Sequence, residues 1–259
     1  MIRKTFAFLA ASMLATPALA APIDGTWVAD INSAQLSTKP KVRSLDHGVY
    51  RCSSCVPVFA IAADGKWHPI KGDPYVDEGM VKVADAHTVM FGYRQKGKSV
   101  NASTATISPD GKTINWTRKN TAANGVETNV EATDVRAAAG AKGAHLISGS
   151  WRNGKIAKMD AAALTVTFGQ DKGMFRMSAP TGEHYEAKLG GPAVAVLGDP
   201  GGTKAAIRQT GPMTWVETDT RKGKLVSTFT IHLVNPTTAN IVSVDHEVGT
   251  TTRYVAHKQ

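Results

Sequence analysis

The 259-residue sequence has little of what most catalytic and cofactor sites are built from. It contains only two cysteines, Cys52 and Cys55, which excludes a four-cysteine zinc site and a network of disulfides. The eight histidines are dispersed, and none has the spacing that places two metal ligands on one strand or helix. Hydrolase signatures such as Gly-x-Ser-x-Gly and His-Glu-x-x-His are missing. These absences favour a non-catalytic protein with no metal and no cofactor.

Aromatic residues and long apolar runs are also scarce. The chain has five tryptophans, five tyrosines and seven phenylalanines, and no run beyond residue 20 approaches the length that spans a bilayer. No window has the periodicity of an amphipathic helix longer than two or three turns. The formal charge is +9, but the basic residues are not gathered among aromatics as in nucleic-acid binding proteins. We therefore expect no transmembrane segment and no nucleic-acid partner, and the oligomeric state stays open.

The first 20 residues have the pattern of a signal peptide. Arg3 and Lys4 form a basic start, residues 5–15 are apolar, and Ala18-Leu19-Ala20 is a small-x-small cleavage site. We expect cleavage after Ala20 and export to the periplasm, with secretion as the alternative.

Cys52-Ser53-Ser54-Cys55 is the sharpest local motif. In an exported protein it predicts a local disulfide between Cys52 and Cys55. Residues three apart on a straight strand face opposite sides, so the two serines must bend the backbone to allow the bridge. A zinc site that recruits His47 or His68 is the alternative, but its set of ligands is incomplete.

The second half of the sequence repeats the first. Four segments recur in the same order: Gly25-Thr26-Trp27 as Gly149-Ser150-Trp151, Gly48-Val49-Tyr50-Arg51 as Gly173-Met174-Phe175-Arg176, Gly72-Asp73-Pro74 as Gly198-Asp199-Pro200, and Lys96-Gly97-Lys98-Ser99-Val100 as Lys222-Gly223-Lys224-Leu225-Val226. Ordered matches at nearly constant separation indicate a duplication. We divide the chain into a signal peptide (1–20), a first repeat (21–136), a small-residue linker (137–146) and a second repeat (147–259).

Alternation of apolar and polar residues predicts short strands throughout both repeats. Residues 80–85 and 88–94 alternate in this way, and Ser108-Pro109-Asp110-Gly111-Lys112 is a turn between two such segments. Short strands separated by Gly, Pro and Asp turns predict an all-β fold of two tandem antiparallel β-barrels. The alternative merges both halves into one larger barrel or sheet, which would remove exposed strand edges.

Several segments carry a resemblance beyond the internal repeat. They are Gly25-Thr26-Trp27, the Gly-x-Tyr-x-Cys-x-x-Cys-x-Pro segment from Gly48 to Pro57, Ala63-Asp64-Gly65-Lys66, the Gly72-Asp73-Pro74-Tyr75 loop and the turn from Ser108 to Thr113. In these segments the chain resembles a family of exported, duplicated proteobacterial β-rich proteins of unknown function with lipocalin-like repeats. The resemblance implies two lipocalin-like barrels whose interiors hold a small apolar ligand, and it implies no activity. The second repeat departs from the pattern at Asn235-Pro236-Thr237, where the turn glycine is lost.

Aromatic side chains are the candidates for lining such an interior. Trp27 and Trp151 stand near the start of each repeat, where an indole is expected to close a barrel core. The expected ligand-binding residues are Trp67, Tyr75, Trp116 and Trp215. Each of the four suits plain packing equally well.

The sequence thus predicts a periplasmic, non-catalytic protein that binds a small apolar or amphipathic ligand or an envelope component. One alternative is a hydrolase or isomerase whose histidines and aspartates converge at a barrel mouth. Another is an interaction module that contacts envelope proteins through exposed strand edges, which an apolar patch without a pocket would favour.

Overall fold

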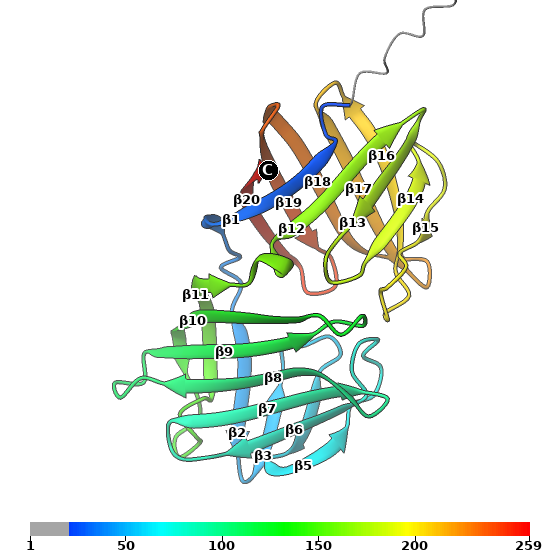
Figure 1. Ribbon diagram of the computed structural model, residues 1–259. Helices are drawn as coiled ribbons and strands as arrows, with labels where there is room; N and C mark the ends of the chain where they lie inside the picture. The colour runs from blue at the N-terminus through cyan, green and yellow to red at the C-terminus, as the bar shows by residue number, and fades with distance from the viewer. Residues whose placement is uncertain (1–20) are drawn as a thin grey trace, which may run out of the picture.

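Alternating burial along the strands builds two antiparallel sheets in residues 21–259, the part of the chain that the computed structural model describes. Along β17 (Thr214–Arg221), for example, Trp215, Glu217 and Asp219 are buried and the residues between them are not. Each sheet has ten strands and curls into a nearly closed barrel (Figure 1). The prediction of an all-β fold with two barrel units is confirmed. The predicted signal peptide lies outside the described residues.

The N-terminal barrel is formed by β2–β11, and the C-terminal barrel by β1 and β12–β20. In spatial order, the N-terminal barrel contains β4 (Phe59–Ala62), β3 (Val49–Cys52), β2 (Lys41–Asp46), β11 (Gly149–Met159), β10 (Glu127–Ala139), β9 (Thr113–Thr121), β8 (Lys98–Ile107), β7 (Thr88–Gln95), β6 (Glu78–Val83) and β5 (Asp64–Pro69). The C-terminal barrel contains β14 (His184–Lys188), β13 (Met174–Ser178), β12 (Thr165–Asp171), β1 (Gly25–Gln35), β20 (Thr250–Lys258), β19 (Thr238–Asp245), β18 (Lys224–Asn235), β17, β16 (Lys204–Gly211) and β15 (Val194–Ala195).

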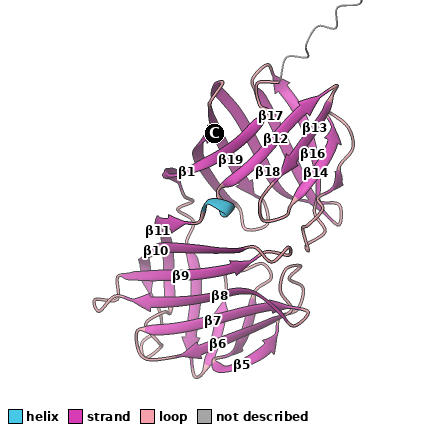
Figure 2. Ribbon diagram, viewed as in Figure 1, coloured by secondary structure: helices cyan, strands magenta, loops and turns pink. Residues whose placement is uncertain are grey.

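Helix is nearly missing from the described chain. Within residues 21–259 the one helical element is the short 3₁₀ helix η1 (Ala161–Ala163), which lies between the two barrels (Figure 2). Over the same residues, no helix has the length and apolar composition needed to cross a membrane.

The two barrels exchange one strand. β1 pairs with β12 and β20 of the C-terminal barrel, whereas β11 pairs with β2 and β10 of the N-terminal barrel. Figure 1 shows β1, in blue, among the strands of the second half. The exchanged strands open with the repeated motifs Gly25-Thr26-Trp27 and Gly149-Ser150-Trp151, so each repeat gives its first strand to the other barrel. The expected linker at 137–146 therefore does not lie between the two sheets. Its first three residues form the end of β10, and β11, which follows it, belongs to the same sheet as β10.

The exchanged strands carry the tryptophans that close the cores. Trp27 is 1% exposed in the core of the C-terminal barrel, and Trp151 is fully buried in that of the N-terminal barrel. Each indole N–H donates to a backbone carbonyl four residues earlier, Ile23 at 2.8 Å and Ile147 at 2.9 Å. The same contact thus seals both cores, and in each barrel the other repeat supplies it.

Substitution of these tryptophans tests whether each one stabilises the barrel in which it packs or the repeat to which it belongs in the sequence. Loss of a buried indole destabilises a core by about 3–5 kcal/mol. Trp27→Ala should therefore accelerate hydrogen–deuterium exchange in β17–β19 and leave β7–β9 protected, although residue 27 belongs to the first repeat. Trp151→Ala should give the reverse pattern. Faster exchange confined to the repeat that carries the substitution would contradict the strand exchange.

Candidate functional site

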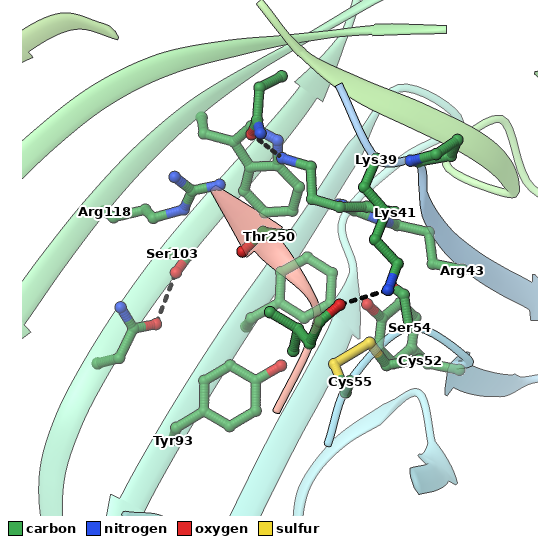
Figure 3. Close-up of a pocket in the computed structure, with 17 residues that line it drawn as sticks. Lys39, Lys41, Arg43, Cys52, Ser54, Cys55, Tyr93, Ser103, Arg118 and Thr250 are labelled. Atoms are coloured by element: carbon green, nitrogen blue, oxygen red, sulfur yellow. Dashed lines mark hydrogen bonds between the residues drawn. A yellow bond between two sulfur atoms is a disulfide. The ribbon is translucent and has the colours of Figure 1, made fainter. Parts of the chain in front are cut away.

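The N-terminal barrel contains a cavity of about 570 Å³, within the range of small-molecule sites. Its walls come from β2, β3, β7, β8, β9 and β11, and Lys39 and Thr250 lie at its edge (Figure 3), where Val248 also lines it. The last two residues belong to the β19–β20 hairpin of the C-terminal barrel. The Lys39 ammonium donates to the Val248 carbonyl, so this hairpin is fastened to the segment before β2, beside the cavity.

Cations dominate the charged groups of this cavity. Lys41 and Arg43 converge on Asp134 of β10, which is only 2% exposed, with 3.4 Å between Arg43 Nη2 and Asp134 Oδ2. The Trp116 indole N–H donates to the same carboxylate at 3.0 Å. A third cation, Arg118, lines the cavity from β9 and forms no ion pair within residues 21–259. With Lys39, the lining therefore carries four cations, and three of them lie near the single carboxylate of Asp134.

Burial acts on these cations as expected for charges removed from water. Desolvation lowers the pKa of Lys41 and of Arg118, and in both cases the Asp134 charge opposes the shift. Figure 3 shows Arg118 extending from β9 into the cavity. A positive charge that is partly desolvated and incompletely paired favours the entry of an anion.

An aromatic wall adjoins the cations. The guanidinium carbons of Arg43 and Arg118 lie 4.9 and 4.7 Å from the centre of the Trp116 ring. Phe91 lies 5.7 Å from Trp116 and 5.1 Å from Tyr50, measured between ring centres. The cavity therefore presents a basic region and an apolar region side by side, which suits a molecule with a charged head and an apolar body.

The predicted disulfide between Cys52 and Cys55 is confirmed, with Cα atoms 5.4 Å apart. The Ser-Ser bend is fastened to β2, because the Ser53 amide donates to the Val42 carbonyl at 3.0 Å and the Val42 amide donates to Ser54 Oγ at 3.1 Å. Both cysteines line the cavity, so the bridge fixes part of its wall. In residues 21–259, no group of three or more His, Cys, Asp and Glu side chains is arranged to hold a metal ion.

Of the four aromatic residues predicted to bind ligand, Trp116 lines this cavity and the other three do not. Trp67 is 37% exposed, beneath the Arg94 guanidinium. Trp215 is fully buried in the C-terminal core, where its indole N–H donates to Gln170 Oε1 at 2.8 Å.

Tyr75 joins the two barrels instead of lining either cavity. Its hydroxyl accepts from Arg221 of β17, whose guanidinium carbon lies 4.9 Å from the centre of the tyrosine ring. The ring also packs on Gly201, where a Cβ would meet tyrosine atoms at 2.6 Å. Gly201 therefore leaves room for the ring that holds the barrels together.

Sequence reasoning missed the cavity cations Lys41, Arg43 and Arg118. Lys41, Arg43 and Leu45 occupy alternate positions of β2, and Trp116 and Arg118 do so on β9. A charged residue at a position where the alternation predicts an inward apolar residue is unusual. This departure from the alternation could have identified the cavity cations from the sequence. No histidine of the described chain lines this cavity, so the converging His/Asp site of the enzyme alternative is not assembled there.

The comparisons with known proteins add nothing to this geometry. No protein-family model, curated protein or solved structure matches the chain. The resemblance to exported proteins with lipocalin-like repeats therefore stays a prediction.

Loss of the Asp134 carboxylate should destabilise the N-terminal barrel. Asp134→Ala leaves Lys41 and Arg43 without their counterion, and breaking a buried pair costs about 3–5 kcal/mol. Urea unfolding should show this loss as a lower midpoint. Glu127→Ala on the same strand removes an exposed partner of Lys119 and should change stability by less than about 1 kcal/mol. Equal effects of the two variants would contradict the ion cluster.

Proposed function

We propose that the protein is a non-catalytic periplasmic binding protein whose N-terminal barrel holds a small amphipathic anion. The surplus of cations in the 570 Å³ cavity carries this proposal. Buried charges in proteins are normally paired, because an uncompensated charge loses its hydration without an equivalent interaction. Lys41 and Arg43 share Asp134, and Arg118 has no carboxylate partner among the described residues. An anionic head group supplies the missing charge.

The chemistry of the cations indicates which anionic head groups the cavity can bind. A guanidinium presents parallel N–H donors that match the oxygens of a carboxylate, sulfate or phosphate. Arg43 is 8% exposed, whereas Arg118 is more accessible from the cavity. We therefore assign direct contact with the head group to Arg118, assisted by Lys41.

The aromatic wall accounts for the apolar part of the ligand. Tyr50 and Phe91 are 4% exposed and border the cavity beside Trp116. Burial raises the pKa of Tyr50, so its phenol stays neutral and adds no negative charge to the wall. An alkyl chain or small ring gains from leaving water along this surface.

Export is supported by the basic, apolar and small-residue pattern of residues 1–20. The bacterial envelope is rich in anionic amphiphiles such as fatty acids and lipid head groups. The resemblance to exported lipocalin-like proteins points in the same direction. A carrier or sensor of such a molecule needs a cavity and no catalytic group.

Titration calorimetry with three ligands that share a ten-carbon chain tests the charge preference. Decanoate should bind to the wild-type protein, and neutral decanol and cationic decyltrimethylammonium should bind at least about tenfold more weakly, a difference of about 1.4 kcal/mol. Arg118→Gln should weaken decanoate binding by about tenfold or more, the range for a hydrogen bond to a charged group.

Lys119→Gln is the matched control, because Lys119 neighbours Arg118 on β9 and is half exposed in a surface pair with Glu127. It should leave decanoate affinity unchanged. Equal binding of the three ligands, or equal effects of the two substitutions, would refute the proposed site.

A further inference from the structure

The C-terminal barrel contains a second cavity, of about 370 Å³, with the opposite electrostatic character. Nearly all of its lining is apolar, including Trp27, Phe168, Phe229 and Ile231. Glu217 of β17 is the one charged side chain that lines it within residues 21–259. The two barrels therefore offer interiors of comparable size and different chemistry.

Strand register shows that this difference lies at equivalent positions. Arg43 stands opposite Gly149 in the N-terminal barrel, and Phe168 stands opposite the repeat-equivalent Gly25 in the C-terminal barrel. A phenylalanine thus occupies the place of the arginine. By the same comparison Val166, opposite Trp27, replaces Lys41, opposite Trp151.

On the wall formed by β7 in the N-terminal barrel and by β17 in the C-terminal barrel, the difference is reversed: the N-terminal barrel has the aromatic residues and the C-terminal barrel has the charged ones. Phe91 and Glu217 lie at equal distances before the repeated Lys-Gly-Lys turns, and each pairs with the equivalent strands of its own barrel. Tyr93 and Asp219 correspond in the same way. The duplicated wall is aromatic in one barrel and acidic in the other.

The two carboxyl groups of this wall are buried without a cation. Glu217 is 8% exposed, and Asp219 is 6% exposed. Glu217 Oε2 accepts from the Tyr185 hydroxyl, and Asp219 Oδ2 accepts from Ser227 Oγ at 2.7 Å. Asp219 Oδ1 is buried and accepts from no amide, hydroxyl or cationic donor of the described residues, and the carboxyl groups of Glu217 and Asp219 lie within hydrogen-bonding reach of each other. Neither carboxyl group takes part in an ion pair of residues 21–259.

The neighbouring cation forms its hydrogen bonds away from this wall, and its buried Nε has no hydrogen-bond partner among the described residues. Arg221 of the same strand donates to Glu247 at 3.0 Å and to the Tyr75 hydroxyl of the other barrel. Its charge acts on Asp219 at a distance but does not reach the cavity beside Glu217. The acidic wall therefore has no cation beside it, and its two carboxyl groups meet each other, the Tyr185 hydroxyl and the Ser227 hydroxyl.

We propose that the C-terminal barrel binds a small apolar amine, with its ammonium group against Glu217 and its hydrocarbon part along the apolar lining. The site goes beyond the proposed anion site and does not depend on it. An ammonium group supplies the charge that Glu217 and Asp219 lack. The walls formed by Phe168, Phe229 and Ile231 remove the hydrocarbon from water.

Proton release accompanies this binding. Burial, with the adjacent Asp219, raises the pKa of Glu217, which favours a protonated carboxyl group before a ligand binds. The other ionisable groups near Glu217 are Tyr185, Tyr254 and Asp219, with Asp199 and Arg221 beyond them, and burial keeps both tyrosines neutral. The ammonium ion stabilises the carboxylate, whose proton leaves to solvent. Affinity should therefore rise with pH and level off above the raised pKa of Glu217.

Titration calorimetry with n-octylamine and 1-octanol tests the site. Wild-type protein should bind the amine at least about tenfold more tightly than the alcohol. At neutral pH the observed heat should depend on the ionisation enthalpy of the buffer, as proton release requires. Glu217→Gln keeps the size of the side chain and an acceptor for Tyr185, and it should weaken amine binding by about tenfold or more while leaving octanol unchanged.

Glu186→Gln is the control, since Glu186 is an exposed acid of β14 whose carboxylate pairs with Arg176 at 3.4 Å. It should bind octylamine like the wild type, and so should Arg118→Gln. Equal affinity of wild-type protein for octylamine and octanol overturns the proposal, as does unchanged amine binding by a folded Glu217→Gln variant. The wild-type comparison needs no substitution, and decanoate titration reports separately on the N-terminal cavity.

Discussion

The pairing of β1 with β12 and β20, matched by that of β11 with β2 and β10, is the constraint on which the rest of the structure depends. Because each barrel is completed by a strand from the other repeat, the chain must cross twice between barrels, at residues 36–40 and 160–164. Lys39 and Pro40 of the first crossing line the N-terminal cavity, and Ala163 and Leu164 of the second line the C-terminal cavity. The exchange thus places equivalent connecting segments at both cavities.

On this shared scaffold the two repeats have diverged in their interiors. The turns and closing tryptophans are retained, whereas Arg43 corresponds to Phe168 and Phe91 to Glu217. A charged group inside a barrel carries a desolvation penalty of several kcal/mol, so such changes do not serve stability. The N-terminal barrel offsets part of this penalty with Asp134, and the C-terminal barrel does so by raising the pKa of Glu217. The opposite interior charges therefore underlie the two different ligands that we propose.

Local patterns were enough to predict much of the fold. Alternation located the strands that became β6 and β7, and the Cys-x-x-Cys spacing, together with the expectation of export, predicted the disulfide. The strand exchange could not be predicted, because Gly25-Thr26-Trp27 and Gly149-Ser150-Trp151 present the same pattern to either barrel. Trp116 was found as an aromatic residue, but Arg43 meets Asp134 from 91 positions away, and no local rule links them.

The contacts between the barrels explain why the N-terminal cavity depends on the whole chain and not only on its first repeat. Lys39 donates to Val248, while Arg221 bonds both to Tyr75 of the N-terminal barrel and to Glu247 of the β19–β20 turn. These polar bonds hold that turn in place as part of the rim, next to the cations of the N-terminal wall. The strand β11 contributes a further lining residue from the second repeat. A protein reduced to residues 21–136 would therefore lack a wall strand, a closing tryptophan and part of the cavity mouth together.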